Sequence, residues 1–475
     1  MNTPDRPAAV PNGTRSPNSL TPSRRGVLRA MAVLPASAVL LGALPGTLGS
    51  ALAAAPPRGS ATRYTIMPFL NSTDATVNVY ESDDATDFRL LKASAYTPPS
   101  GRIRDASIIR HSDGYYYVTY TTHTWQDTST TIGFARSSDR VNWTFLYDYT
   151  VPIANLSRAW APEWFVDSDG SVNIILSCST TNDQWIFTPY LLRATNSALT
   201  AWSSPVALSG IGANHIDTFI VKLGSTYHAF TKNETTRYIE YATATALTGP
   251  YTIRRTGNWA GWGGTREGAA LVQLDNGAWR MFFDGYGDGS YYYSDSYDTF
   301  ATWSAPKRLP SISGTARHFT VLKETVSGGV NLSANVSRSL RSANYTTRYW
   351  QEQSALLNLP VVSSTSSAAE RQAATFTVVP GLADAGGYSF RNAAGNYLRH
   401  WDFRARFDAN DGSSIFARDA TYIARTGTAS GSVRFESYNY PGYYLRHYGF
   451  QLRVDPADGS DVFRQDSSFV PVNPL

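Results

Sequence analysis

The sequence is poor in cysteine and in charged side chains. Its single cysteine, Cys178, cannot form a disulfide within the chain, so packing must stabilise the fold. Charged residues make up only 16% of the 475 residues and the formal net charge is +4, which gives no electrostatic reason to expect a nucleic acid partner. A hydrophobic share of 42% and an aromatic share of 13% exclude disorder. The length predicts roughly two to four folded units.

An uninterrupted membrane-spanning apolar run is also missing. The motif SRRGVL begins at Ser23 and is followed by a stretch rich in Ala and Leu, which prolines interrupt and which ends in Ala51-Leu52-Ala53. Twin arginines before an apolar stretch and a small-x-small site predict a twin-arginine signal peptide over residues 1–55, rather than a permanent membrane helix. We therefore expect a secreted bacterial protein that has no membrane association after cleavage.

Amphipathic helices are not evident between residues 62 and 320. This region consists of short β-branched and aromatic runs bounded by Gly, Asp, Asn and Ser, which predicts an all-β fold. An aromatic residue closes a turn-rich segment at five places that lie 49 to 59 residues apart: Phe88, Trp143, Trp202, Tyr251 and Trp303. A unit of about 50 residues with three or four strands is typical of a propeller blade. We predict a five-bladed β-propeller over residues 56–335, with a pair of β-sandwiches as the alternative.

Five polar residues follow the same period. Asp105, Glu163, Asp217, Glu267 and His318 are 50 to 58 residues apart, and each opens a short apolar run. In a propeller the innermost strand of each blade starts near the axis, so these five side chains are expected to meet in one pocket.

Carboxylates gathered in an enclosed pocket fit the cleavage of a glycosidic bond. That reaction uses one protonated acid for the leaving oxygen and one ionised base for water. Asp105, Asp217 and Glu267 supply three carboxyl groups, and their mutual repulsion would keep one of them protonated. The alternative is that these acids only stabilise turns. Nearby aromatic side chains suit stacking against sugar faces: Trp160, Trp164, Trp262 and Tyr286.

His318 has two interpretations. It is either a core histidine with satisfied hydrogen bonds or an axial group that binds a cation or water beneath the sugar. We expect no required cofactor, with calcium or sodium on the propeller axis as a candidate structural cation and His318 as its ligand.

The tail, from about Ser339, has its own repeat. The segments that begin at Asn396 and Tyr443 align with a constant shift of 47 residues. A weaker third copy has Tyr349, Glu352 and Ala373 at the positions of Tyr, His and the last Asp. Three such lobes predict a β-trefoil over residues 336–475. The pairs at equivalent positions are Tyr397 and Tyr444, His400 and His447, Asp408 and Asp455, Asp411 and Asp458, and Asp419 and Asp466.

The motifs RDASII, WAPEW, HIDTFIVKLGSTYHAFTKNE, EGAALVQLDNG and ARHFTVL resemble glycoside hydrolase family 43, over about residues 62–325. The resemblance implies an inverting hydrolase in which Asp105 is the general base, Asp217 tunes and positions the acid, and Glu267 is the general acid. Phe319 departs from the pattern, because many relatives carry Gly after this histidine. The expected sugar-binding residues of this pocket are Trp160, Glu163, Trp262, Tyr286 and Arg317.

The tail resembles the arabinofuranose-binding β-trefoil of carbohydrate-binding module family 42, over about residues 339–473. The resemblance implies sugar binding by His400 with Asp419 and by His447 with Asp466, and it leaves the first lobe without a working site. The alternative is that these pairs only stabilise turns that were repeated by duplication.

Together the two resemblances imply a secreted exo-acting α-L-arabinofuranosidase. This class of enzymes includes those that cleave α-1,5-linked arabinan. The expected partner is an arabinose-containing plant polysaccharide, and the expected state is a monomer. The alternatives are a β-xylosidase, an endo-arabinanase and a non-catalytic arabinan-binding protein.

Overall fold

The computed structural model describes residues 60–475, so the expected signal peptide over residues 1–55 lies outside the described residues. Strands dominate this part of the chain, and its helices are three six-residue segments. The all-β prediction is confirmed. No helix in residues 60–475 is long and apolar enough to cross a membrane.

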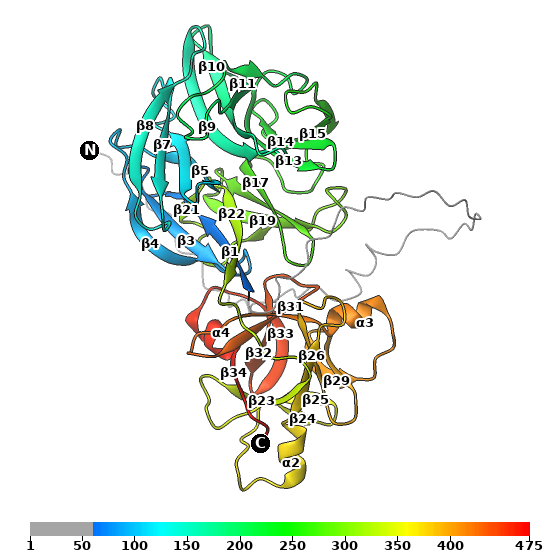
Figure 1. Cartoon of the computed structure of the whole chain (residues 1–475). Helices are drawn as coiled ribbons and strands as arrows, with labels where there is room; N and C mark the ends of the chain where they lie inside the picture. The colour runs from blue at the N-terminus through cyan, green and yellow to red at the C-terminus, as the bar shows by residue number, and fades with distance from the viewer. Residues whose placement is uncertain (1–59) are drawn as a thin grey trace, which may run out of the picture. The chain divides into compact units, whose positions relative to one another are not determined.

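Five four-stranded antiparallel sheets make up the propeller, which confirms the predicted five blades and excludes paired sandwiches (Figure 1). The first blade contains β5 (Arg104–Arg110), β6 (Tyr116–Thr121), β7 (Thr131–Ser137) and β8 (Thr144–Thr150). The second contains β9 (Leu156–Val166), β10 (Val172–Thr180), β11 (Asp183–Arg193) and β12 (Val206–Ala207). The third contains β13 (His215–Leu223), β14 (Thr226–Asn233), β15 (Ile239–Ala244) and β16 (Thr252–Arg255). The fourth contains β17 (Glu267–Gln273), β18 (Trp279–Gly285), β19 (Ser290–Ser296) and β20 (Lys307–Arg308).

The fifth blade joins the two ends of the propeller. Its strands run in the order β22 (Val321–Ser327), β1 (Ser60–Ile66), β3 (Val77–Ser82) and β4 (Arg89–Tyr96). β1 pairs with β22 over its whole length, from Ser60 opposite Ser327 to Ile66 opposite Val321. A separate short pair joins β2 (Phe69–Leu70) to β21 (Ala316–Arg317). Backbone hydrogen bonds between the first and last propeller strands therefore close the ring.

Each pair of neighbouring blades encloses its own apolar layer. Phe134 of the first blade and Ile174 of the second share one such cluster, and equivalent clusters lie between the other four pairs. The periodic aromatics belong to this packing, since each lies within four residues of the start of an outermost strand. Trp202, for example, stacks on Phe134 with ring centroids 5.5 Å apart. The repeat seen in the sequence is thus the packing repeat of the blades.

The remaining strands form one twelve-stranded sheet around a second core. Pairings of β25 and β29 with β33 make this sheet barrel-like. Trp350, fully buried, packs against Phe390, Phe435 and Phe469 at its centre. The strands are β23 (Val336–Ser342), β24 (Gln351–Gln353), β25 (Leu356–Asn358), β26 (Phe376–Pro380), β27 (Tyr388–Arg391), β28 (Tyr397–Trp401), β29 (Arg404–Asp408), β30 (Tyr422–Thr426), β31 (Val433–Ser437), β32 (Tyr443–Tyr448), β33 (Gln451–Pro456) and β34 (Ser468–Val472).

The three helices occupy equivalent places in this C-terminal barrel. A serine side chain caps the N-terminus of each helix by accepting a hydrogen bond from a backbone N–H of the first turn. The capping residues Ser367, Ser413 and Ser460 are 46 and 47 residues apart, which matches the sequence repeat. The helices are α2 (Ala368–Ala373), α3 (Ser414–Asp419) and α4 (Asp461–Asp466).

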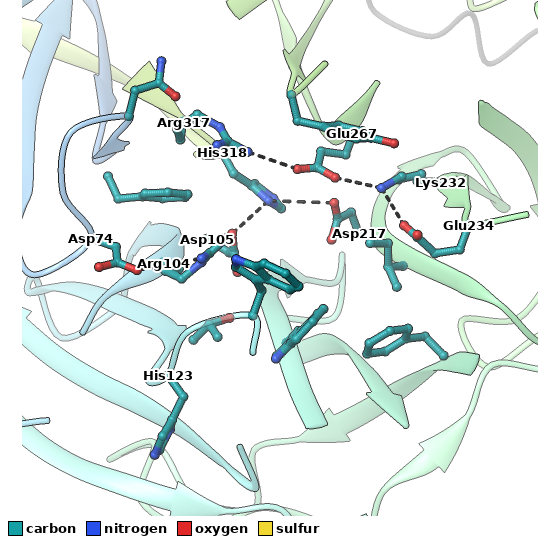
Figure 2. Close-up of a pocket in the computed structure, with 18 of the residues that line it drawn as sticks. Asp74, Arg104, Asp105, His123, Asp217, Lys232, Glu234, Glu267, Arg317 and His318 are labelled. Carbon is teal, nitrogen blue, oxygen red and sulfur yellow. Dashed lines mark hydrogen bonds and ion pairs between the residues drawn. The ribbon is translucent and has the colours of Figure 1, made fainter. Parts of the chain in front are cut away.

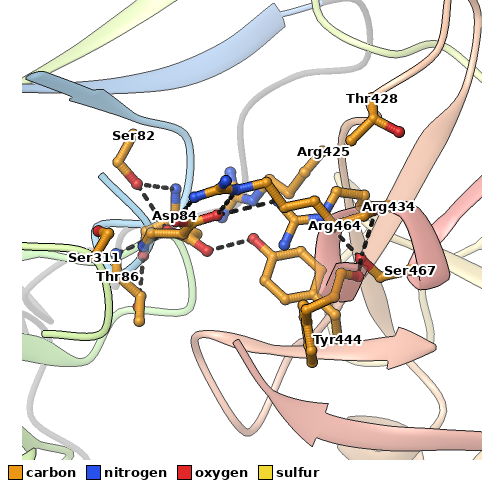
Figure 3. A network of polar contacts seen from close by, with 12 residues as sticks. Ser82, Asp84, Thr86, Ser311, Arg425, Thr428, Arg434, Tyr444, Arg464 and Ser467 are labelled. Carbon is orange, nitrogen blue, oxygen red and sulfur yellow. Dashed lines mark hydrogen bonds and ion pairs between the residues drawn. The ribbon is translucent and has the colours of Figure 1, made fainter. Parts of the chain in front are cut away.

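Buried charges link the loop between β3 and β4 to the C-terminal barrel (Figure 3). Tyr444 donates a hydrogen bond of 2.5 Å to Asp84, and Arg464 makes a two-pronged contact of 2.7 and 2.8 Å with Asp87. Burial alone would raise the pKa of Asp84, but Arg434 and the bond from Tyr444 lower it to about 2. Both aspartates are almost fully buried, so the loss of one partner would leave an uncompensated charge.

Candidate active site

A cavity of about 840 Å³ brings together residues of all five blades. Seven of the expected site residues line it: Asp105, Trp160, Asp217, Glu267, Tyr286, Arg317 and His318. Figure 2 shows Asp105, Asp217 and Glu267 gathered around His318, as the period in the sequence predicted.

An irregularity in the innermost strands places these side chains. Four of these strands carry a left-handed residue at a shift in register: Asp105 (φ 51°), Ala161 (φ 46°), Asp217 (φ 54°) and Gly268 (φ 61°). Non-glycine residues in this conformation are strained by about 1–3 kcal/mol, and such strain gathers at functional sites. Gly268 has a second requirement, because a Cβ there would lie 2.9 Å from the His318 ring.

His318 is the centre of the acidic cluster. Its Nδ1 lies 3.2 Å from Asp105 and 3.8 Å from Asp217, and its Nε2 lies 3.6 Å from Glu163. Burial alone would lower the pKa of His318, but the charges of Asp217 and Asp105 raise it well above its ordinary value. The side chain is therefore an imidazolium at neutral pH.

The protonation of His318 bears on the cation expected on the propeller axis. An imidazolium has both nitrogens protonated and no lone pair to offer a cation. In residues 60–475, no group of three or more His, Cys, Asp and Glu side chains is arranged as a metal site. In its protonated form His318 offers no ligand atom, and calcium or sodium on the propeller axis stays a prediction.

Asp105 and Asp217 have opposite electrostatic environments. Burial would raise the pKa of Asp105, but the charge of His318 and its hydrogen bond lower it to about 2. Burial raises the pKa of Asp217 to about 7; His318 opposes this shift and the charge of Glu267 adds to it. Asp217 also accepts a hydrogen bond of 3.1 Å from the Gly268 N–H. Near neutral pH the cavity thus holds an ionised Asp105 beside a protonated or titrating Asp217.

Two cations hold Glu267. Lys232 donates a hydrogen bond of 2.8 Å to one carboxylate oxygen, and Arg317 lies 3.4 Å from the other. Lys232 also pairs with Glu234 at 2.5 Å and lies over the Tyr286 ring at 4.3 Å. Burial alone would lower the pKa of Lys232, but Glu267 and Glu234 raise it above its ordinary value. These contacts fix the position of the Glu267 carboxylate.

Lys232 and Glu234 are not among the site residues predicted from the sequence, although both lie at the end of the third motif, in the segment TKNE. One feature of the sequence could have indicated them: a lysine at the end of an apolar run, with a glutamate two residues later. Asp284 was missed as well: burial raises its pKa to about 6 against the opposing charge of Arg317, whose Nε lies 2.5 Å away.

Two expected sugar contacts lie elsewhere. Trp262 is 4% exposed and packs in the core between the third and fourth blades, with ring centroids 5.2 Å from Trp303 and 5.5 Å from Phe283. Glu163 is 3% exposed and contacts the far nitrogen of His318, without lining the cavity. Aromatic and acidic residues of the repeated motifs therefore divide between the cavity and the core, and their positions in the sequence do not separate the two groups.

Trp164 and Phe319 are also core residues. Trp164 packs against Phe134 and Trp202 between the first and second blades. Phe319 stacks on Tyr291 with centroids 4.2 Å apart, in the apolar layer between the fourth and fifth blades. The residue that departs from the family pattern thus extends a core layer and does not fill the cavity.

The C-terminal barrel holds two equivalent polar clusters. His400 lies 3.6 Å from Asp419, and Asn439 bridges them with contacts of 3.0 Å to His400 and 2.7 Å to Asp419. The second cluster repeats this pattern: His447 lies 3.3 Å from Asp466, and Asn344 bridges the two. The predicted His and Asp pairs are therefore brought together. The two bridging asparagines were missed, because they come from a different part of the repeat.

The equivalent place in the first copy of the repeat differs. Glu352 accepts a hydrogen bond of 2.8 Å from Asn392, and Ala373 stands where the other two copies have aspartate. These three residues line a shallow cavity of about 240 Å³.

Comparison with known proteins gives matches to both parts of the chain. Residues 71–327 match the family described as "Probable glycosyl hydrolase domain", which is related to glycoside hydrolase family 43. Residues 338–471 match the alpha-L-arabinofuranosidase B (ABFB) domain.

The chain is similar to an alpha-L-arabinofuranosidase of Hypocrea jecorina, at 31% identity over 183 residues, which are 37% of this chain and 35% of that protein. It is also similar to an "Arabinofuranosidase/B-xylosidase" of Trichoderma koningii, at 34% identity over 26% of each protein. The matched segments thus span about a third or less of these relatives. A solved family 43 beta-1,3-galactosidase has 10% identity and a TM-score of 0.42, covering 86% of this chain and 88% of its own.

The family match covers more than half of the chain and coincides with the five-bladed ring that holds the carboxylate cavity. The protein therefore belongs to the glycosyl hydrolase family related to glycoside hydrolase family 43.

Proposed function

We propose that the protein is a secreted, inverting, exo-acting α-L-arabinofuranosidase. The observation that carries this proposal is the contrast between Asp105 and Asp217 in one cavity, with a pKa of about 2 for the first and about 7 for the second. Two carboxyl groups whose environments separate their pKa values are the arrangement that lets one site supply both a base and a proton.

Asp105 is the proposed base. Its carboxylate takes a proton from water as the water oxygen attacks the anomeric carbon. His318 keeps Asp105 ionised and in place at 3.2 Å. The bond from the anomeric carbon to the leaving oxygen breaks in the same step.

Glu267 is the proposed acid, which delivers a proton to the leaving oxygen. Asp217 retains a proton near neutral pH and lines the same cavity, so it is the proposed source of the proton that Glu267 passes to the leaving oxygen. Lys232 and Arg317 orient the Glu267 carboxyl. The proposed inversion requires room for a water molecule, which corresponds to about 6.5–9.5 Å between the Asp105 and Glu267 carboxyl groups.

L-Arabinofuranose at the end of a polysaccharide is the proposed substrate. The two curated relatives are named as arabinofuranosidases, and the C-terminal match is to a domain of alpha-L-arabinofuranosidase B. A β-xylosidase is the second candidate, favoured by the double name of one relative. We propose arabinose-containing plant polysaccharide as the natural partner.

The C-terminal barrel is proposed to be a β-trefoil that binds arabinofuranose. The helices at spacings of 46 and 47 residues support three lobes. The matching His, Asp and Asn clusters support two sugar sites, at His400 with Asp419 and at His447 with Asp466. The first lobe lacks both the histidine and the aspartate.

A product assay tests the proposal. The purified protein should release arabinose from debranched arabinan or arabinoxylan, and proton NMR should show the first product as the β-anomer, since inversion changes the configuration. Asp105→Asn and Glu267→Gln should each reduce turnover about a hundredfold or more while the protein stays folded. Release of xylose alone would favour the β-xylosidase, and near-normal turnover of either variant would remove that residue from its role.

A further inference from the structure

Two exposed tryptophans lie at the wall of the catalytic cavity. Trp125 and Trp185 line it, are 54% and 52% exposed, and have ring centroids 6.4 Å apart. They come from different blades, since Trp125 lies between β6 and β7 and Trp185 is in β11. Large aromatic side chains that gather exposed on a surface are typical of binding sites.

Neighbouring polar groups order the surroundings of both tryptophans. Arg158, which is 3% exposed, places its guanidinium 4.0 Å from the Trp185 ring and donates a hydrogen bond of 3.1 Å to the Gln184 carbonyl. In the Trp125 loop, the Asp127 carboxylate accepts hydrogen bonds from the backbone and hydroxyl of Thr124, at 3.2 and 2.6 Å.

The pair continues inward to the catalytic groups. Trp160 lies 6.2 Å from Trp185 and 4.9 Å from Phe187, and both Trp160 and Phe187 line the cavity together with Asp105. Trp125, Trp185, Trp160 and Phe187 therefore form a series of neighbouring rings in the wall of the cavity that Asp105 also lines.

We propose that Trp125 and Trp185 form a platform for the leaving part of the substrate, a neutral chain of at least two sugar units beyond the scissile bond. The proposal rests on the proposed glycosidase function and adds the part of the substrate that remains after cleavage. Sugar rings present apolar C–H faces that stack on indole rings. The exposed indole rings carry no charge and offer an apolar stacking surface, which matches a neutral sugar chain.

Substrates of different length test the platform. Specificity constants are measured for methyl α-L-arabinofuranoside and for α-1,5-linked arabinotetraose, with the parent and with the double variant Trp125→Ala/Trp185→Ala. The ratio of tetraose to methyl glycoside should fall about tenfold in the double variant. An unchanged ratio would overturn the proposal. Trp125→Phe/Trp185→Phe keeps the aromatic surface and should retain most of the ratio, which gives a folded comparison if the alanine variant is unstable.

Tyr115→Ala is the matched control. Tyr115 is 39% exposed and lies 4.8 Å from the Arg136 guanidinium, so it repeats the exposed aromatic and arginine pair outside the cavity. The ratio of the specificity constants for tetraose and methyl glycoside should be the same in Tyr115→Ala as in the parent. An equal fall in this control would show that the loss is not specific to the platform and would overturn the proposal.

Failure of the proposed function gives a different result. If the parent cleaves neither substrate, the platform is tested by calorimetric binding of arabino-, xylo- and galacto-tetraose to Asp419→Ala/Asp466→Ala, in which the C-terminal sites are removed. At least one tetraose should bind, and the added Trp125→Ala/Trp185→Ala change should weaken that binding about tenfold. Equal binding with and without the tryptophan substitutions, or no binding of any tetraose, would overturn the proposed platform.

Discussion

The His318 Nδ1 lies 3.2 Å from the Asp105 Oδ1, and this contact connects the segment before β22 to the innermost strand of the first blade. One imidazolium thus holds the proposed base in its ionised form. The same ring faces Asp217 and Glu163, so its charge affects the whole cluster.

His318→Gln should shift the acid limb of kcat/KM to higher pH. The reason is that the pKa of Asp105 is held at about 2 by His318 against the effect of burial, and a neutral amide removes that charge. Activity profiles between pH 3 and 7 check this. His228→Gln, at a half-buried histidine stacked on Tyr241, is the control and should keep the parent profile. An unchanged acid limb in His318→Gln would contradict the proposed role.

Asp217→Asn should become more stable relative to the parent as the pH rises. The folded-state pKa of Asp217, about 7, lies above the ordinary value of 3.8. Its contribution to stability is therefore fully present below pH 3.8 and is lost as the pH rises through about 7, whereas the amide does not titrate. Denaturant unfolding at pH 4 and pH 8 should show the difference between variant and parent growing by a few kcal/mol. A constant difference would argue against the raised pKa.

Lys232→Met should lower kcat about tenfold or more with a smaller change in KM. The substitution removes the hydrogen bond of 2.8 Å that orients Glu267 and leaves Glu234 without this partner. Lys222→Met is the control. Lys222 makes a comparable ion pair with Asp167, and both Lys222 and Asp167 lie outside the cavity lining. Equal kcat values in both variants would mean that Lys232 has only a structural role.

Asp419→Ala or Asp466→Ala should weaken binding to arabinoxylan in part, and the double variant should nearly abolish it. Two linked weak sites reinforce each other through effective concentration. Binding isotherms on the insoluble polymer check this, beside hydrolysis of a small arabinoside, which needs only the propeller cavity. Retained polymer binding in the double variant would contradict the proposed division between the two parts.

The repeated features of the fold were predictable from the sequence. A blade recurs about every 50 residues. The periodic aromatics, such as Phe88 and Trp143, therefore predict the ring of blades, and the periodic polar residues, such as Asp105 and Asp217, predict which side chains lie near its axis. The barrel repeat at His400 and His447 was visible for the same reason.

Lys232 and Trp185 were missed because their contacts follow no such period. Lys232 meets Glu267 across two blades, and Trp185 reaches the cavity from β11, the third strand of the second blade, so no spacing along the chain indicates either contact. The expected sugar contact of Trp262 was wrong for a related reason. An aromatic residue just before an innermost strand is equally compatible with the cavity and with the layer between blades, and only packing decides between them.

The closure of the ring also governs when the cavity becomes complete. Arg317 and His318 immediately precede the seven-residue pairing of β22 with β1, two strands that lie at opposite ends of the propeller sequence. Pairing over such a separation is slow to form and has a large loop-closure entropy. Arg317 and His318, which contact Glu267 and Asp105, therefore take their places when the ring closes, so the complete cluster forms together with the closed fold.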